Sequence, residues 1–254
     1  MYKLILLDLD GTLLDSRKNI SEYTLSVLEQ CRRKGMLVGI ATARSEVLAE
    51  RFIDWVKPDI VISNSGGLVR CHGEIIFSCM FSEEETAALV RSGLDAELEI
   101  TVDTPDKSYE NFKADTGEQF PDWSNTVHTD YYDFHERAFK VCIHSTDSDF
   151  AKAAAAKVKD CDYIPFSDCD WFKFSKAGAS KEKAIPPIEA ALGISANEVI
   201  AFGDDYVDIE MLKYCGRGVA MGNAIDEVKR AADEVTSDND SDGVAVYLEK
   251  NFLQ

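Results

Sequence analysis

The sequence has no long apolar run, no pair of cysteines spaced as CxxC, and no internal repeat or low-complexity segment. Its longest apolar runs are far shorter than the about 20 residues that a membrane-spanning helix needs. The N-terminus places a single lysine before a strand-like segment, which is unlike a signal peptide. The seven cysteines are an odd number, which argues against a disulfide framework or a zinc site. We therefore expect reduced thiols and a cytoplasmic protein that does not bind membranes.

Basic residues are also scarce, because 27 lysines and arginines face 46 acidic residues, for a net charge of −19. The resulting field repels nucleic acid and anionic membrane surfaces, so neither is expected as a partner. The field also repels any anionic ligand. An anion site in this chain therefore needs local positive charge from a basic side chain, a helix N-terminus or a metal ion.

The chain does contain enough apolar material for a large core, since 45% of its 254 residues are hydrophobic. Near-continuous apolar strands alternate with amphipathic helices at both ends of the chain. This α/β pattern predicts a Rossmann-like, doubly wound parallel sheet whose ligands bind beyond the C-terminal ends of the strands. The expected strands are 3–8, 36–41, 59–63, 198–202 and 218–221, and the expected helices are 21–34, a helix after Ser45, 180–192, 207–214, 224–232 and 242–252.

The rhythm changes between residues 82 and 178, where short strands and two helices flank a polar stretch dotted with aromatic residues at 104–138. We expect this segment to be a separate α+β domain inserted into a core domain formed by residues 1–81 and 179–254. The elements expected in the insertion are helices 83–94 and 149–159 and strands 98–103, 139–145 and 171–175.

Two aspartates follow the first strand in the segment Leu7-Asp8-Leu9-Asp10-Gly11-Thr12. Because side chains alternate along a strand, Asp8 and Asp10 should point the same way. Gly11 allows a sharp turn, and Thr12 offers a hydroxyl to an anion. Paired carboxylates suit hard metal ions and acid–base chemistry, although a lone pair of this kind more often caps nearby backbone.

Three further clusters fall at the same expected edge of the sheet, and each contributes a group that phosphoryl transfer can use. They are Ala41-Thr42-Ala43-Arg44 after the second strand, Ser180-Lys181 after the insertion, and Gly203-Asp204-Asp205-Tyr206-Val207-Asp208 after strand 198–202.

Together and in this order, the four motifs resemble those of the haloacid dehalogenase superfamily. The long insertion resembles the C2-type cap of its Cof-like, class IIB phosphatases, and Val219-Ala220-Met221-Gly222-Asn223-Ala224 is similar to the AMGNA segment of that subfamily. The resemblance spans nearly the whole chain. It implies a Mg²⁺-dependent phosphatase for a small phosphorylated metabolite, such as a sugar phosphate, a nucleotide or a phosphorylated cofactor.

By this resemblance, Asp8 would be the nucleophile that forms an aspartyl-phosphate, and Asp10 would protonate the leaving group and then take a proton from water. Mg²⁺ would be held by the Asp8 carboxylate, the Asp10 carbonyl and Asp204. Asp208 would bind or orient a metal-bound water. The residues themselves support a cation here, because four acidic groups in one cleft repel one another unless a divalent ion and Lys181 offset them.

The same resemblance assigns the phosphate contacts to Thr42, Lys181 and Asn223. Lys183 is the alternative to Lys181, because it lies two residues further along the chain. Asn223 is equally consistent with a cap for the helix that follows it.

Three positions depart from the family pattern. Ala43 replaces the glycine of ATGR, and Ser65 stands where an asparagine usually precedes the glycines. Val207 replaces the asparagine of GDxxND, whose amide could hydrogen-bond to the groups that bind the metal. These changes bear on metal affinity and turnover more than on the type of reaction.

The cap is expected to close over the site, exclude water and recognise the leaving group. Aromatic side chains there could stack on a ring, although such residues more often pack in the core of their own domain. The six candidates are Tyr109, Phe112, Phe120, Trp123, Tyr131 and Tyr132.

Three other functions compete with the phosphatase. A phosphomutase would return the phosphoryl group to a sugar hydroxyl, and a weakly active homologue would only bind phosphometabolites. A phosphoacceptor receiver domain needs only about 120 residues, which leaves the insertion unexplained. We expect a monomer or a homodimer with a small-molecule substrate.

Overall fold

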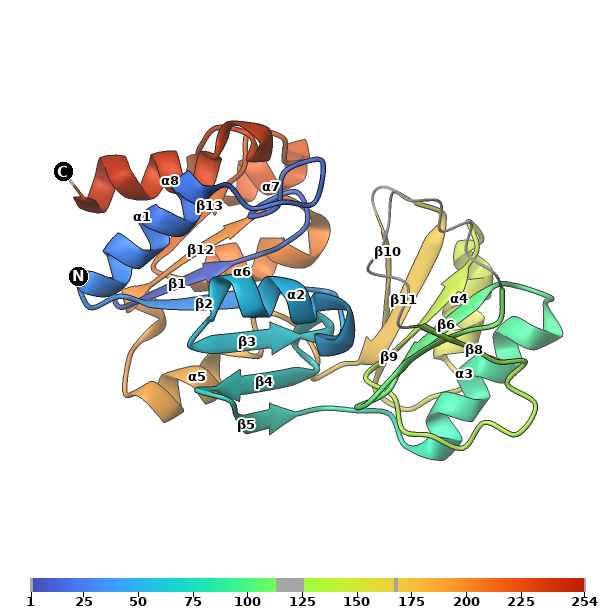
Figure 1. Ribbon diagram of the computed structural model, residues 1–254. Helices are drawn as coiled ribbons and strands as arrows, with labels where there is room; N and C mark the ends of the chain where they lie inside the picture. The colour runs from blue at the N-terminus through green and yellow to red at the C-terminus, as the bar shows by residue number, and fades with distance from the viewer. Residues whose placement is uncertain (1, 113–125, 167–168, 254) are drawn as a thin grey trace. The chain divides into compact units, whose positions relative to one another are not determined.

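The computed structural model describes residues 2–112, 126–166 and 169–253 (Figure 1). The chain forms two compact units. The first unit contains Met1–Ala43, Phe52–Phe77 and Ser180–Gln254, and the second contains Arg44–Arg51 and Ser78–Ala179. The boundaries predicted from the sequence, 1–81, 82–178 and 179–254, stay a prediction, as does the role of the second unit as a cap.

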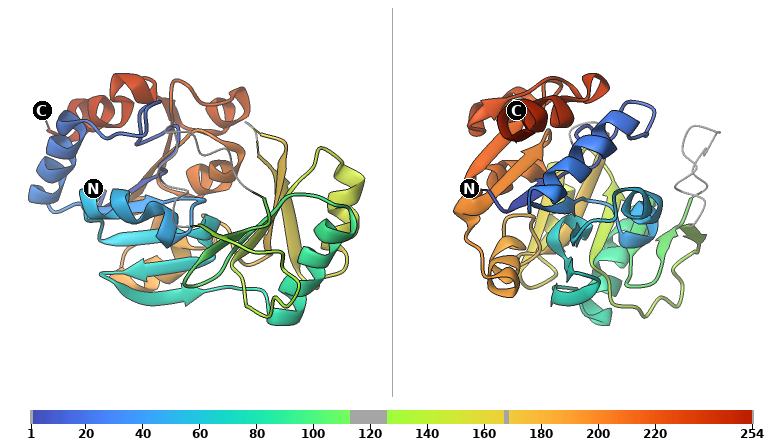
Figure 2. Two further views of the ribbon diagram at one scale, coloured as in Figure 1. Left: turned by 45° about the vertical axis from the view of Figure 1, so that its right-hand side comes forward. Right: turned by 60° about the vertical axis from the view of Figure 1, so that its left-hand side comes forward.

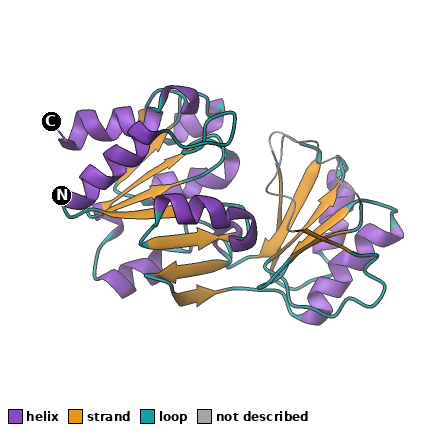
Figure 3. Ribbon diagram, in the orientation of Figure 1, coloured by secondary structure: helices purple, strands orange, loops and turns teal. Residues whose placement is uncertain are grey.

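The first unit is built on an eight-stranded sheet with the order β14-β13-β12-β1-β2-β3-β4-β5 (Figure 3). The strands from β14 to β3 run parallel, which confirms the doubly wound parallel core. β4 pairs antiparallel with β3 and was not expected, because a four-residue strand after two glycines leaves little periodicity to detect. The strands are β1 (Leu4–Leu7), β2 (Leu37–Ala41), β3 (Ile60–Ser63), β4 (Leu68–Cys71), β5 (Glu74–Ser78), β12 (Val199–Gly203), β13 (Arg217–Ala220) and β14 (Glu234–Val235).

β1 lies in the middle of this sheet, and all four of its residues are fully buried. Leu7 pairs with Phe202 of β12 on one side and with Ile40 of β2 on the other. Because all three strands are parallel, their C-terminal ends meet at one edge of the sheet. The residues that follow them, including Asp8 and Asp204, are therefore brought to that edge.

Helices lie on both faces of this sheet (Figure 2). Parallel crossovers are right-handed, so the helices after β1 and β2 cover one face and the helix after β12 covers the other. α1 begins as predicted at its cap Ser21, whose Oγ accepts the Thr24 N–H at 2.9 Å, and the chain turns at Gly35 with φ 86°. The helices are α1 (Glu22–Arg33), α2 (Glu46–Val56), α5 (Ile185–Leu192), α6 (Ile209–Tyr214), α7 (Asp226–Ala231) and α8 (Gly243–Leu248).

The helix predicted from residue 180 begins later, at Ile185. Two prolines, Pro186 and Pro187, occupy its first turn, where proline starts a helix rather than continues one. Residues 181–184 form turns instead, which leaves Lys181 in the connection ahead of the helix.

The second unit contains a six-stranded sheet with the order β10-β11-β9-β6-β7-β8. α3 and α4 pack against its apolar face, where Val102, Val141 and Phe174 are buried. β7, β8 and β10 were not predicted, and α4 ends at Ala155 because turns and a positive φ at Asp160 lead the chain into β10. The elements are α3 (Glu83–Asp95), β6 (Ile100–Asp103), β7 (Ser108–Glu110), β8 (Thr126–His128), β9 (Lys140–His144), α4 (Ser148–Ala155), β10 (Cys161–Pro165) and β11 (Trp171–Lys176).

Within the described ranges, the structure contains no helix of the length and apolarity that crossing a membrane requires.

Candidate active site

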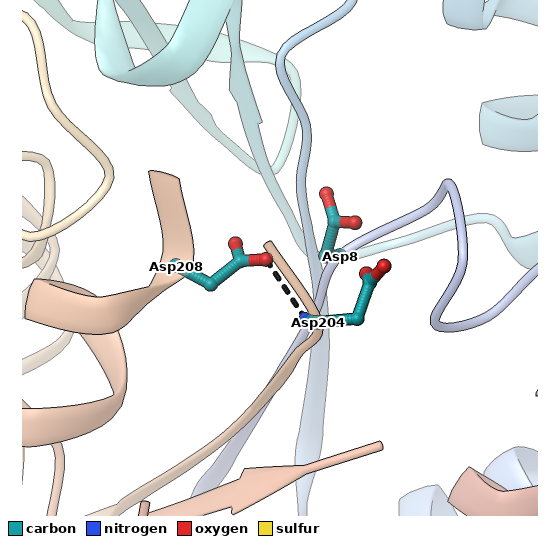
Figure 4. Close-up of side chains that lie close together, drawn as sticks. All are labelled: Asp8, Asp204 and Asp208. Carbon is teal, nitrogen blue, oxygen red and sulfur yellow. Dashed lines mark hydrogen bonds between the residues drawn. The ribbon is translucent and has the colours of Figure 1, made fainter. Parts of the chain in front are cut away.

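Three carboxylates converge beyond the C-terminal ends of β1 and β12 (Figure 4). Asp8 follows β1, Asp204 follows β12, and Asp208 ends a short 3₁₀ turn. One side-chain oxygen from each lies within 4.8 Å of the other two. Asp8 is far in sequence from Asp204 and Asp208, and it meets them only because β1 and β12 are neighbours in the sheet.

The loop after β12 folds around the Asp208 carboxylate. Asp208 Oδ2 accepts the backbone N–H groups of Asp204 at 3.0 Å and of Asp205 at 3.1 Å (Figure 4 draws the first of these bonds). Gly203 is needed here, because a Cβ at that position would lie 2.5 Å from Asp208 Cβ. The loop therefore has one close-packed form that presents two carboxylates side by side.

Lys181 supplies the local positive charge that an anion site needs in a chain with a net charge of −19. Its Nζ donates to Asp8 Oδ1 and to Asp208 Oδ1, both at 2.6 Å, and its side chain is fully buried. Lys183, the alternative from the sequence, is exposed. The structure thus places Lys181 rather than Lys183 at the centre of the carboxylate cluster.

Burial and the neighbouring charges together shift the pKa values of the residues in the cluster. Burial raises the pKa of Asp8 well above its usual value, and the charges of Asp208 and Asp204 add to this, while Lys181 opposes it. Burial and Asp208 likewise raise the pKa of Asp204 to about 7, against a hydrogen bond from Thr12. Burial alone would lower the pKa of Lys181, but Asp208 and Asp8 outweigh it and raise that pKa.

The turn after the first strand contributes a second layer of contacts. Thr12 Oγ1 donates to Asp204 Oδ1 at 2.8 Å. Gly11 has φ 74°, and a Cβ there would overlap the Asp204 carboxylate. Glycine is therefore required at this position both for its backbone conformation and for its lack of a side chain.

Asp10 does not join the carboxylate cluster. Its Oδ1 instead accepts from Lys18 Nζ at 2.6 Å. The expectation that Asp8 and Asp10 point the same way assumed a strand through both residues, whereas β1 ends at Leu7 and the alternation stops there. The sequence did not predict the contact between Lys18 and Asp10. It depends on a turn in which Lys18 has φ 60° and which returns the chain toward Asp10.

Thr42 and Asn223 both belong to the first unit. Thr42 is buried after β2, and its backbone N–H donates to the Ile62 carbonyl at 2.8 Å. Asn223 Nδ2 donates to the Gly11 carbonyl at 2.8 Å, and its Oδ1 accepts the Asn239 N–H at 3.0 Å. Asn223 therefore stabilises the turn after the first strand, whereas the N-cap position of α7 is Ile225. Contact with phosphate stays a prediction for both Thr42 and Asn223.

The donor set fits a hard divalent cation. Among the described residues, three acidic side chains offer oxygen atoms at a common point, and carboxylate oxygens are the ligands that Mg²⁺ prefers. Lys181 offsets one of the three negative charges, and a divalent ion offsets the other two. Burial, and after it the charges of the neighbouring aspartates, raises the pKa values of Asp8 and Asp204, and a bound cation would oppose both effects.

Known proteins resemble the chain over its whole length. Two phosphatases from Bacillus subtilis strain 168, YitU and YcsE, are each named 5-amino-6-(5-phospho-D-ribitylamino)uracil phosphatase. YitU is 29% identical over 266 residues, covering 98% of this chain and 97% of YitU. YcsE is 29% identical over 244 residues, covering 96% of this chain and 93% of YcsE.

Solved structures share the fold. A haloacid dehalogenase-like hydrolase from Bacteroides thetaiotaomicron has a TM-score of 0.86 at 26% identity, covering 99% of this chain and 100% of its own. A sugar phosphatase of HAD subclass IIB, BT4131, has a TM-score of 0.84 at 24% identity and 98% coverage of both chains, which shows a common fold.

The family of haloacid dehalogenase-like hydrolases matches residues 5–248, a range that contains all four motifs and the insertion between them. With the carboxylates and Lys181 at the expected edge of the sheet, this match confirms the resemblance drawn from the sequence. The chain belongs to the haloacid dehalogenase-like hydrolase family and is an enzyme of that family.

Proposed function

We propose that this enzyme is a Mg²⁺-dependent phosphatase that hydrolyses a small phosphorylated metabolite through an aspartyl-phosphate on Asp8. The observation that carries the proposal is the buried Lys181 ammonium, 2.6 Å from both Asp8 and Asp208. An ammonium at this distance favours the carboxylate form of Asp8, which is the form that can attack. The phosphatase names of the relatives support the same reaction.

In the first step, Asp8 attacks the substrate phosphorus. Lys181 binds Asp8 Oδ1, so the other oxygen, Oδ2, forms the new bond while the bond from phosphorus to the leaving oxygen breaks. Asp10 gives a proton to that oxygen as it leaves. Lys181 and the Thr42 hydroxyl stabilise the negative charge on the phosphoryl oxygens.

In the second step, a water molecule attacks the phosphorus of the aspartyl-phosphate, and Asp10 takes the proton of that water. The bond between Asp8 and phosphorus breaks, which releases inorganic phosphate and restores the Asp8 carboxylate. Lys18 Nζ donates to Asp10 Oδ1 at 2.6 Å and so holds the Asp10 carboxyl group in one position for these proton transfers.

Mg²⁺ would be held by the carboxylates of Asp8 and Asp204, by the backbone carbonyl of Asp10 and, through water, by Asp208. When bound, it would neutralise the charge of the phosphoryl group and of the surrounding acids. The chain keeps these ligands in place through the bonds from Thr12 to Asp204 and from the loop N–H groups to Asp208.

The second unit would act as the cap that recognises the leaving group. Of the six aromatic candidates, Tyr109 and Tyr131 belong to the apolar core of this unit, and Phe112 packs on Trp171 with ring centroids 5.6 Å apart. Tyr132 is 93% exposed, so its ring takes no part in the core of this unit and is the candidate we propose for contact with the leaving group. Phe120 and Trp123 lie outside the described residues.

The proposal is tested by measuring phosphate release from p-nitrophenyl phosphate and from a panel of sugar phosphates, nucleotides and phosphorylated cofactor precursors. We expect activity with Mg²⁺, loss of activity with EDTA, and loss in Asp8→Asn. A beryllium fluoride adduct at Asp8 would mark the nucleophile. Asp54→Asn, an exposed carboxylate on α2, is the matched control and should keep full activity.

Two results would contradict the proposal. One is an isomerised sugar phosphate in place of free phosphate, which would show a mutase. The other is full activity in Asp8→Asn, which would place the nucleophile elsewhere.

A further inference from the structure

The turn between β3 and β4 holds three consecutive polar residues whose side-chain oxygens have no hydrogen-bond partner among the described residues. These atoms are Ser63 Oγ, Asn64 Oδ1 and Ser65 Oγ. All three residues are at most 1% exposed. Buried polar atoms are nearly always paired, because an unpaired one loses its bonds to water without replacement. The turn therefore has an energetic cost that its role as a connection does not explain.

The backbone of the same turn adds to this cost. Asn64 has φ 52° and Ser65 has φ 56°, in the left-handed region that glycine adopts without strain. Asn tolerates this conformation better than Ser does. Glycine at position 65 would form the same turn with neither the strain nor the unpaired hydroxyl, so the fold itself does not require the Ser65 side chain.

The position of the turn between β3 and β4 suggests why its energetic cost is tolerated: the turn lies against the proposed phosphate-binding residues. The Ser65 N–H donates to the Thr42 carbonyl at 3.0 Å, so Ser65 is bonded directly to the residue proposed to contact the phosphoryl group. On its other side, Gly66 packs so closely on the backbone of Ser180 that a Cβ would overlap it. Ser180 directly precedes Lys181. The turn thus contacts both chain segments that supply the proposed phosphate ligands.

We propose that Ser65 is a further phosphate-binding residue, whose hydroxyl donates a hydrogen bond to a phosphoryl oxygen of the substrate beside Thr42. The inference rests on the proposed phosphatase function. A phosphoryl oxygen only accepts hydrogen bonds, and the Ser65 hydroxyl, which has no partner among the described residues, has its donor available for one. The substrate class is a phosphate monoester whose phosphoryl group enters between Thr42 and Lys181.

The test compares Ser65→Ala with the wild type in thermal unfolding, in the binding of inorganic phosphate with Mg²⁺ by calorimetry, and in kinetics with p-nitrophenyl phosphate. We expect the melting temperature to rise, because the variant removes an unpaired buried hydroxyl. Phosphate affinity and kcat/KM should each fall about tenfold to a hundredfold, as expected for a hydrogen bond to a charged group.

Thr24→Ala is the matched control, since Thr24 is equally buried in the first unit but its Oγ1 bonds to Asp242 Oδ1 at 2.9 Å. This variant should lower the melting temperature and leave phosphate binding unchanged. A Ser65→Ala protein that binds phosphate as the wild type does would overturn the proposal. A lower melting temperature in Ser65→Ala would overturn it as well, by showing that the hydroxyl already has a partner.

The calorimetric readout separates this inference from the proposed function. If the wild type hydrolyses the ester and Ser65→Ala is unchanged, the role of Ser65 fails and the phosphatase stands. If the wild type binds phosphate without hydrolysing any ester, the phosphatase fails while the phosphate contact is still measured.

Discussion

The Lys181 ammonium lies 2.6 Å from Asp208 Oδ1, and both side chains are fully buried. A buried pair of this kind is costly to form, and removing one partner leaves a charge without compensation. Asp208 also organises the loop after β12 by accepting two backbone N–H groups. The same pair therefore joins the stability of the loop to the electrostatics of the site.

Replacing Lys181 with methionine should abolish hydrolysis and destabilise the metal-free protein at pH 8 by about 3–5 kcal/mol. The reason is that Asp8 and Asp208 lose the ammonium that bonds to both of them, while both stay buried. Urea unfolding and phosphate release measure the two effects. Lys183→Met, at an exposed position, should change neither, and equal losses in both variants would refute a special role for Lys181.

Stability of the metal-free protein should depend on pH through Asp204. Its pKa is raised from 3.8 to about 7 by burial and by Asp208, so folding favours the protonated form. The contribution of Asp204 to stability is therefore full below pH 3.8 and is lost as the pH rises to about 7. When thermal unfolding is measured in EDTA, the melting temperature should fall less between pH 5 and pH 8 in Asp204→Asn than in the wild type.

The same reasoning predicts that Mg²⁺ stabilises the wild type more at pH 8 than at pH 5, because protons compete with the ion for the carboxylates. Identical stabilisation at the two pH values would contradict the assignment of the cluster as the metal site.

The effect on kcat of changing Asp10 or Lys18 should depend on how much the leaving group needs a proton. Asp10→Asn should lower kcat for an alkyl phosphate by about 10²–10⁴-fold and for p-nitrophenyl phosphate by much less, because p-nitrophenolate leaves without a proton. Lys18→Met, which removes the hydrogen bond from Lys18 to Asp10, should show the same selectivity in weaker form. Steady-state kinetics with both esters give the comparison, and Lys18→Arg should restore most of the loss. A uniform loss on both esters would argue against proton transfer by Asp10.

Gly11→Ala should weaken Mg²⁺ binding at least about tenfold, because the new Cβ overlaps the Asp204 carboxylate. Gly73→Ala is the matched control: Gly73 has φ 85° and open space around it, so the substitution strains the backbone without a clash. Calorimetric titration with Mg²⁺ compares the two proteins. Equal affinities in the two variants would contradict the prediction, by showing that the overlap with Asp204 does not weaken Mg²⁺ binding.

Local chemistry explains the elements that were predictable from the sequence. Ser21 caps α1 as expected, and the apolar run Leu4–Leu7 forms a strand buried on both faces. The helix predicted from residue 180 began late because Pro186 and Pro187 are better at starting a helix than at extending one. The strands β7 and β8 have three residues each, too few for an alternating pattern to be recognised.

Some features of the site were also predictable from the sequence, and others were not. Motif order alone identified Asp8, Lys181, Asp204 and Asp208, and the structure brings their side chains together. Their roles in binding and catalysis stay predictions for the experiments above. The sequence did not indicate that Asp10 pairs with Lys18, because that contact depends on where β1 ends and on how the following turn bends back.

The order of residues was sufficient to establish the family, the parallel α/β core and the acidic motifs, because periodicity, capping and motif spacing are local properties of the chain. The packed structure alone determined which aspartate stays outside the cluster and that Ser65 adjoins Thr42. Such pairings depend on strand neighbours and on turns closed between residues far apart in sequence. No local pattern records them, because their energy comes from burial and contact that exist only after folding.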